Sequence, residues 1–167
     1  ITLGEWNKSI QFNLTGTYLC AKAVVPHMKK QGSGKITNFS SVSGHAKDDT
    51  NSAYVAAKAG SMAFTKKIAN EVSPYGVNCN DIAPGVTATG RSTWWENLSN
   101  EEKQGVTDRI PLKRLGQPDD QAKIVAFLAS QDSDYGQSTW AAADRQLVRR
   151  LGCKLKPSGV NVAGTHS

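Results

Sequence analysis

The pattern of apolar and polar residues along the chain predicts three helices. Residues 3–31 carry an apolar stripe of helical period, made of Trp6, Ile10, Leu14, Tyr18, Ala21, Val25 and Met28. Residues 52–72 predict a second long helix, which is rich in small side chains. A third helix runs through Ala129, with Pro118 and acidic residues in its first turn. Glycines follow the first helix and Gly76 follows the second, as is typical of helix ends.

Two short β-prone segments, residues 35–40 and 77–82, lie between these helices and predict strands. Residues 42–51 predict a polar loop, and residues 86–110 a long loop with a short helix around residues 94–104. Helices that alternate with strands predict an α/β fold, in which a parallel sheet lies between two helical layers. Two strands are too few for a stable doubly wound sheet, so we expect the chain to be the later part of a longer protein. No signal-peptide pattern is visible in its first residues, which do not include an initiator Met, as expected if its start is missing.

The composition limits the classes of protein that this chain can represent. Its 167 residues suit one domain, and no apolar run approaches the roughly 20 residues that cross a bilayer. The formal net charge of +6 invites a nucleic-acid hypothesis, but the excess lies near the C-terminus, in Arg145, Arg149, Arg150, Lys154 and Lys156 against Asp144. A basic tail without aromatic stacking residues favours a solvated tail. We therefore expect neither a membrane nor a nucleic-acid partner.

The three cysteines predict neither a disulfide framework nor a metal centre. Cys20, Cys79 and Cys153 are far apart, and no histidine lies at a metal-ligand spacing from them. We expect free thiols in the cytoplasm.

The chemistry of the chain is concentrated in the segment Tyr54-Val55-Ala56-Ala57-Lys58. Residues four apart share one face of a helix, so the phenol and the ammonium are neighbours. A lysine ammonium beside a phenol favours the phenolate, which prepares the phenol for proton transfer near neutral pH. The spacing alone is common on surface helices, so its meaning depends on the motifs around it.

Five motifs stand in order around this pair. They are Asn13-Leu14-Thr15-Gly16, Asn38-Phe39-Ser40-Ser41, Tyr54-Val55-Ala56-Ala57-Lys58-Ala59-Gly60, the segment from Asn80 to Thr89, and the segment from Pro111 to Pro118. In this register, the chain resembles the short-chain dehydrogenase/reductase family over residues 1–138. The resemblance implies a partial Rossmann-like fold that lacks the N-terminal βαβ half, and a nicotinamide-dependent oxidoreductase acting on alcohols or ketones.

The resemblance assigns catalytic roles to four residues. Tyr54 matches the family's acid/base, and Lys58 the lysine that assists this tyrosine and hydrogen-bonds the nicotinamide ribose. Ser41, which lies 13 residues before Tyr54, matches the serine that holds the substrate oxygen. Asn13 matches the asparagine that kinks the long helix and holds a water in a proton relay. Ser40 is expected to be structural.

Further residues match the cofactor-binding segment of the family. Pro84 and Gly85 follow a strand at the carboxyl edge of the sheet, where open α/β sheets bind ligands. By resemblance, the Thr87 backbone binds the nicotinamide carboxamide, and the Thr89 hydroxyl contacts the carboxamide or the pyrophosphate. Tyr54 and Lys58 also face the cofactor. No metal is implied.

The chain also departs from the family pattern. It has no glycine-rich first βα turn and no residue that selects the cofactor, so the choice between NAD and NADP cannot be read. After Gln137 we expect no strand, and residues 138–167 are expected to be an atypical basic tail that follows the catalytic portion, residues 1–137. Gln121 occupies a position that is usually apolar.

Two alternatives remain beside the oxidoreductase. The missing cofactor segments favour a truncated, non-catalytic module that serves in binding or oligomerisation. A hydrolase with Ser41 as nucleophile is the third, although neither a Gly-x-Ser-x-Gly elbow nor an SxxK motif is present. In the family, helices matching residues 3–31 and 52–72 pair between subunits, which implies a homodimer or homotetramer.

Overall fold

The computed structural model describes residues 1–45, 50–90 and 93–137 and the backbone of residues 140–142. Along the chain, its elements are α1 (Leu3–Ile10), the π-helical turn η1 (Gln11–Thr15), α2 (Gly16–Gln31), β1 (Gly34–Phe39), η2 (Val42–Gly44), α3 (Ser52–Val72), η3 (Ser73–Tyr75), β2 (Val77–Ala83), α4 (Thr93–Glu96), α5 (Asn100–Arg109), α6 (Pro118–Ala129), η4 (Gln131–Ser133) and β3 (Trp140–Ala142).

The first helical run begins at a capping box and ends at a glycine. The Thr2 side chain accepts a hydrogen bond from the Glu5 backbone, and the Glu5 carboxylate accepts one from the Thr2 backbone at 2.7 Å. Gly32 ends α2 in the left-handed conformation. The helix predicted over residues 3–31 is confirmed, with the π turn η1 inserted at its middle.

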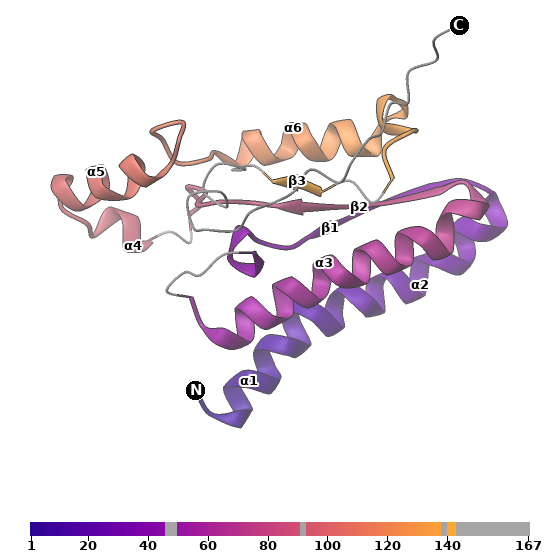
Figure 1. The fold of residues 1–167 in the computed structure, drawn as a ribbon, viewed down its shortest axis with the longest axis horizontal. Helices are drawn as coiled ribbons and strands as arrows, with labels where there is room; N and C mark the ends of the chain where they lie inside the picture. Colours follow the sequence, from indigo (N-terminus) through magenta and orange to yellow (C-terminus); the bar gives the residue numbers. More distant parts are fainter. Residues whose placement is uncertain (46–49, 91–92, 138–139, 143–167) are drawn as a thin grey trace, which may run out of the picture.

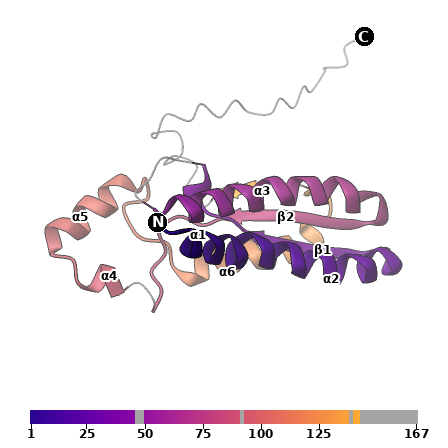
Figure 2. The ribbon, with the colours of Figure 1, turned by 90° about the horizontal axis from the view of Figure 1, so that it is seen from below.

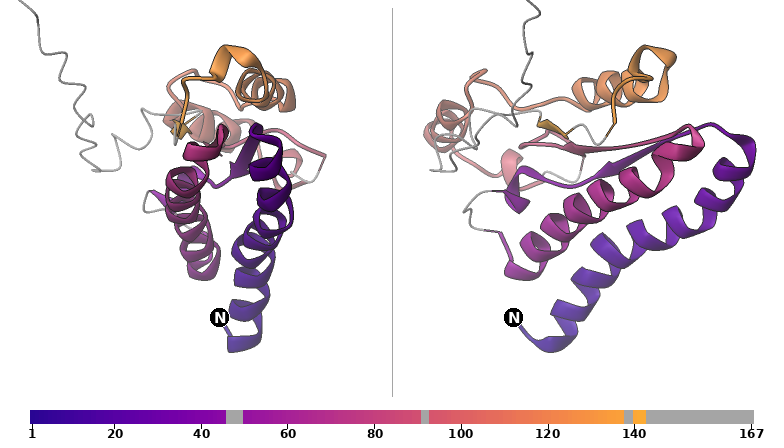
Figure 3. Two further views of the ribbon diagram at one scale, coloured as in Figure 1. Left: turned by 90° about the vertical axis from the view of Figure 1, so that its right-hand side faces the viewer. Right: turned by 45° about the vertical axis from the view of Figure 1, so that its right-hand side comes forward.

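The three strands form a parallel sheet in the order β1-β2-β3. Helices α2 and α3 run side by side along one face of the sheet, and α6 lies on the other (Figures 1 and 3). Helices α4 and α5 stand beyond the end to which β2 points (Figures 1 and 2). The predicted α/β fold with a parallel sheet between helices is confirmed.

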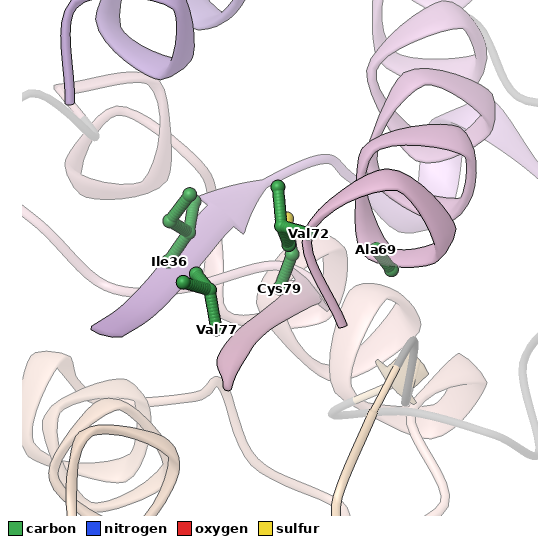
Figure 4. Packing of buried hydrophobic residues seen from close by; sticks show 5 residues of the cluster. All are labelled: Ile36, Ala69, Val72, Val77 and Cys79. Carbon is green, nitrogen blue, oxygen red and sulfur yellow. The ribbon is translucent and has the colours of Figure 1, made fainter. Parts of the chain in front are cut away.

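The core forms where β1 and β2 pack against the C-terminal half of α3. Its buried members are Ile36, Ala69, Val72, Val77 and Cys79 (Figure 4). Val25 and Met28 of α2 pack against this group from the side. Alanine at position 69 lets α3 approach the sheet closely, so the small side chains noted in the sequence serve helix-to-sheet packing.

Two sequence predictions need correction. We expected no strand after Gln137, but β3 pairs in parallel with β2, with Asp81 opposite Trp140 and Ala83 opposite Ala142. The strand is only three residues long, which is too short to show the alternation of apolar and polar residues that indicates a strand. Its pairing partner β2 is also distant in the sequence. The single helix predicted around residues 94–104 is two helices, α4 and α5, because Ser99 forms a capping box with Glu102 and starts a new helix. The basic residues at positions 145–156 lie outside the described residues.

Side-chain amides hold the chain against β2 just before β3 begins. The Gln137 Oε1 accepts a hydrogen bond from the Cys79 backbone at 2.7 Å, and its Nε2 donates to the Val77 carbonyl at 3.0 Å. The Asn78 and Asn80 amides both donate to the Gly136 carbonyl, at 3.2 and 2.9 Å. We call these three side chains the amide clamp.

No helix in the part of the chain that the structure describes is both long enough and apolar enough to cross a bilayer.

Two glycines with left-handed backbones give a matched pair of stability predictions. Gly32 has φ +74°, with nothing within 4 Å of an added Cβ, whereas at Gly76, with φ +71°, the Cβ would lie 2.3 Å from the Gly32 carbonyl oxygen. Gly32→Ala should cost about 1 kcal/mol of unfolding free energy through φ alone. Gly76→Ala should cost at least about 2 kcal/mol, because the backbone must also shift. Urea unfolding measures both, and equal losses would contradict the steric argument.

Candidate active site

The carboxyl ends of β1 and β2 are joined by backbone hydrogen bonds that continue past both strands. The Ser40 N–H donates to the Ile82 carbonyl at 2.9 Å, and the Val42 N–H donates to the Pro84 carbonyl at 3.2 Å. Ser41 therefore lies beside Pro84, at the edge where open α/β sheets bind ligands. The backbone pairing thus brings these two sequence motifs together at one edge of the sheet.

Ser41 begins the short turn η2 and is buried. Its hydroxyl oxygen accepts a hydrogen bond from the Ser43 N–H at 3.2 Å, so its own proton can be donated to a substrate oxygen. Gly44 lets this turn approach α3, because an added Cβ would lie 2.9 Å from the Ala59 backbone nitrogen. Gly44 thus brings the turn that follows Ser41 against the part of α3 that carries Lys58.

Tyr54 and Lys58 lie on the first two turns of α3, directly after the N-cap residue Asn51. The Asn51 side chain caps the helix by accepting from the Ala53 N–H at 2.8 Å. The Lys58 Nζ lies 5.6 Å from the centre of the Tyr54 ring and donates to the Phe39 carbonyl at 2.8 Å. The two side chains share one half-buried face, as predicted, and Lys58 reaches the end of β1.

Asn13 lies in the π turn η1. Its side-chain amide donates to the Ser9 carbonyl at 3.0 Å, while its own carbonyl accepts from the Thr17 hydroxyl at 3.3 Å. The neighbouring Leu14 packs on α3, since an added Cβ on Gly60 would lie 2.9 Å from Leu14 Cδ2. The helix is locally altered at Asn13, in the π turn whose Leu14 packs on α3, and the proton relay implied by the resemblance stays a prediction.

The second group of predicted residues follows β2. The Thr87 hydroxyl donates to the Gly85 carbonyl at 3.1 Å, and Thr87 forms a parallel bridge with Gly116. Thr89 is exposed further along this loop. The structure therefore places Pro84, Gly85 and Thr87 at the carboxyl edge of the sheet, but on a segment held by the residues before α6.

A pocket of about 160 Å³ opens between this loop and α6. Gly85, Thr87, Arg114 and Gln121 are among the residues that line it. The Arg114 guanidinium beside Asp120 holds the pKa of that carboxyl at about 2, and the ion pair measures 2.6 Å. One wall of the pocket is thereby fixed by the start of α6.

Asp81 is a charged residue at this edge that sequence reasoning did not single out. It is 4% exposed, near the carboxyl end of β2, and its Oδ2 accepts a hydrogen bond from the Ser40 hydroxyl. Burial raises the pKa of Asp81 to about 6, although Ser40 and Lys58 oppose the rise. A carboxylate inside an otherwise buried strand is the sequence feature that could have indicated it. Ser40, expected to be structural, holds this carboxylate.

The pKa values of Lys58 and Cys79 are also shifted by burial and by the charge of Asp81. Burial lowers the pKa of Lys58, and the charge of Asp81 acts against this. Burial raises the pKa of the Cys79 thiol to about 12, so Cys79 is a neutral core residue. Among the described residues, no group of three or more His, Cys, Asp or Glu side chains could hold a metal ion.

A parallel α/β sheet with a Tyr–Lys helix pair at its carboxyl edge defines a class of protein, and comparison with known proteins identifies it. A family model described as enoyl-(acyl carrier protein) reductase matches residues 1–145. The chain belongs to the short-chain dehydrogenase/reductase family.

Curated relatives share about two residues in five with the chain. It is 42% identical over 131 residues to a 3-oxoacyl-(acyl-carrier-protein) reductase of Haemophilus influenzae, covering 78% of this chain and 53% of the relative. It is 37% identical over 132 residues to estradiol 17-beta-dehydrogenase 8 of Callithrix jacchus, covering 78% of this chain and 96% of the relative. The chain spans about half the length of most curated relatives that it matches.

Solved structures show the same fold. Levodione reductase superposes with a TM-score of 0.82 at 32% identity, over 89% of this chain and 59% of that one. A Brucella melitensis 3-oxoacyl-(acyl-carrier protein) reductase with bound NAD has a TM-score of 0.76 at 31% identity, over 86% and 52%. A Burkholderia cenocepacia gluconate 5-dehydrogenase in complex with NADP and tartrate has 0.82 at 29%, over 89% and 58%. Relatives therefore bind either cofactor.

The titration of Asp81 predicts how stability changes with pH. The carboxyl keeps its proton up to about pH 6 in the fold, against a usual pKa of 3.8, so folding loses stability as pH rises between these values. The loss should be at most about 3 kcal/mol. Urea unfolding of the parent and Asp81→Asn at pH 3.5, 5 and 7 measures the difference. Parallel pH profiles for the two proteins would contradict the assignment.

Proposed function

We propose that the protein containing this chain is an NAD(P)-dependent oxidoreductase that interconverts an alcohol and a carbonyl compound. The observation that carries the proposal is the contact of Lys58 with both Tyr54 and the end of β1, two residues before Ser41. Relatives named as reductases and dehydrogenases support the same reaction class. The nicotinamide would supply or accept the hydride.

The proposal assigns one task to each residue of this group. Ser41 keeps its hydroxyl proton and donates a hydrogen bond to the substrate oxygen, which orients this oxygen toward Tyr54. Tyr54 donates a proton to that oxygen in reduction and takes one in oxidation. Lys58 favours the charged form of the phenol during this transfer. Asn13, on the π turn facing α3, supports a water that returns protons to Lys58.

The cofactor site draws on residues from both sides of the edge. An ammonium carries three donors, and the Phe39 carbonyl takes one of them, so Lys58 can also serve the ribose hydroxyls of NAD or NADP. Gly85, Thr87 and Thr89 lie on the loop that would face the carboxamide, and Pro84 anchors it to Val42. The complete fold would be a doubly wound, Rossmann-like sheet, and free thiols such as Cys79 suit a cytoplasmic location.

The alternative is a non-catalytic module of this family that binds partners. Such a module would keep the carboxyl edge of the sheet described above but would bind a partner there without catalysing a reaction.

We also propose that copies of the chain pair through α1, α2 and α3. Large apolar side chains are exposed along the first helical run, with Phe12 at 75% and Leu19 at 54% exposure. Such a surface is unusual unless it is covered.

Substitution of Phe12, an exposed aromatic residue of the first helical run, tests this pairing. Phe12→Glu should convert a dimer or tetramer into a monomer, because a charge would have to be buried at the contact. Light scattering at micromolar protein concentration measures the mass. Tyr75→Glu, also exposed but in η3, is the matched control and should leave the mass unchanged. A monomeric parent chain would contradict the pairing.

Removal of one hydroxyl tests the reaction. Tyr54→Phe should lower NAD(P)H-dependent reduction of a ketone by at least about 100-fold, because the proton donor is lost while the ring is kept. Absorbance of the reduced nicotinamide measures turnover. Tyr75→Phe is the matched control, since it removes the same hydroxyl group from a tyrosine beyond the other end of α3.

Cofactor binding, followed by nicotinamide fluorescence in the same samples, separates the two functions. Parent and Tyr54→Phe should bind NAD(P)H equally, with turnover only in the parent. Full turnover by Tyr54→Phe would contradict the proposed acid/base. A parent protein that neither binds nor turns over either cofactor would favour the non-catalytic module.

A further inference from the structure

We propose that Asp81 is a positioning residue for Lys58: its buried carboxylate, held by Ser40, keeps the Lys58 amine charged and directed at the end of β1. The inference deepens the proposed function and rests on it, because it assigns the source of the charge that the Tyr54–Lys58 pair requires.

The first step is the isolation of the carboxylate. Asp81 is 4% exposed, its Oδ2 accepts from the Ser40 hydroxyl, and its Oδ1 is buried without a hydrogen-bond partner among the described residues. A buried carboxylate with one hydrogen bond is unstable unless a cation compensates it. The position would favour a small or apolar side chain if it served packing alone.

The second step is the position of the compensating cation. The Lys58 Nζ donates to the Phe39 carbonyl at 2.8 Å, and Phe39 directly precedes Ser40, which binds Asp81. Phe39, the last residue of β1, therefore holds the cation, and Ser40, which follows it, holds the anion. The ion pairs that the structure describes lie elsewhere, so the two charges act across the end of the strand rather than in direct contact.

The third step concerns the other groups that act on Asp81. Lys66, an exposed residue further along α3, also attracts the carboxylate, and the Cys79 thiol on β2 stays neutral. His45, which follows η2, interacts with Lys66, and burial lowers the pKa of its imidazole. Of the two lysines, Lys58 is half-buried and lies against the end of β1. Burial destabilises the charged form of Lys58, so a nearby carboxylate stabilises this ammonium more than that of the exposed Lys66.

The consequence follows from linkage. Because each charge stabilises the other, Asp81 keeps Lys58 protonated and Lys58 keeps Asp81 ionised at neutral pH. A protonated Lys58 retains the three donors needed for Phe39, Tyr54 and the cofactor. Loss of the carboxylate would leave the lysine in place but shift its protonation to lower pH.

Residue-resolved lysine titration tests the proposal without requiring enzyme activity. In the chain labelled with ¹³C at lysine Cε, Asp81→Asn should lower the pH midpoint of Lys58 by about one unit, which is a tenfold change in the ratio of neutral to charged amine. Asp134→Asn is the matched control: it removes the exposed carboxylate that pairs with Lys35 at the other end of β1, and should leave Lys58 unchanged. A Lys58 midpoint shared by parent and Asp81→Asn overturns the proposal.

The parent protein offers a second measurement that needs no substitution. The Lys58 Cε resonance should show a step near pH 6 as Asp81 ionises, and a flat resonance from pH 5 to 7 overturns the coupling. Turnover gives the third measurement: the basic limb of the pH profile should move to lower pH in Asp81→Asn, with the Michaelis constant at the optimum little changed.

These outcomes separate the inference from the reaction. If Tyr54→Phe keeps full turnover while Lys58 still shifts in Asp81→Asn, the proposed reaction fails and the electrostatic coupling stands. If Lys58 does not shift, the inference fails whatever the turnover.

Discussion

The parallel pairing of β1 with β2 is the constraint on which the site depends. Because the two strands run in the same direction, they end at one edge, and their hydrogen bonds continue through Ser40–Ile82 and Val42–Pro84. An antiparallel pair would place these segments at opposite ends. The helix α3 then needs a single long side chain, Lys58, to reach this edge from the face of the sheet. Sequence motifs 40 or more residues apart thus become neighbours through backbone pairing.

Much of this arrangement could be predicted because its causes are local. Helix α3 has caps, small residues and a helical period between Ser52 and Val72, so both its bounds and the shared face of Tyr54 and Lys58 were predictable. The order of strand, Ser41, helix and Pro84 likewise follows from short motifs. Such features are encoded within a few residues of one another, which is the range over which periodicity is informative.

The parts that were missed depend on contacts between distant segments. Strand β3 is only three residues long, and its partner is β2, some 60 residues earlier, with the amide clamp holding the chain that leads to it. Asp81 appeared in the sequence as one letter of a strand motif. Its surroundings are set by burial, by the Ser40 hydrogen bond and by the charge of Lys58 on another element, and the spacing of residues in the sequence does not show these contacts.

The amide clamp has a consequence for how this part of the fold tolerates change. Gln137 and the two asparagines of β2 bond to backbone atoms, so they set where the chain enters the sheet without using the side chains that follow. The register of β3 is therefore decided before its first residue. The sequence after Gln137 can therefore change in composition, as the basic residues at positions 145–156 of this chain illustrate, while the carboxyl edge of β2 stays in position. Variation at the end of the chain is thereby uncoupled from the edge of the sheet at which Ser41 and Pro84 lie.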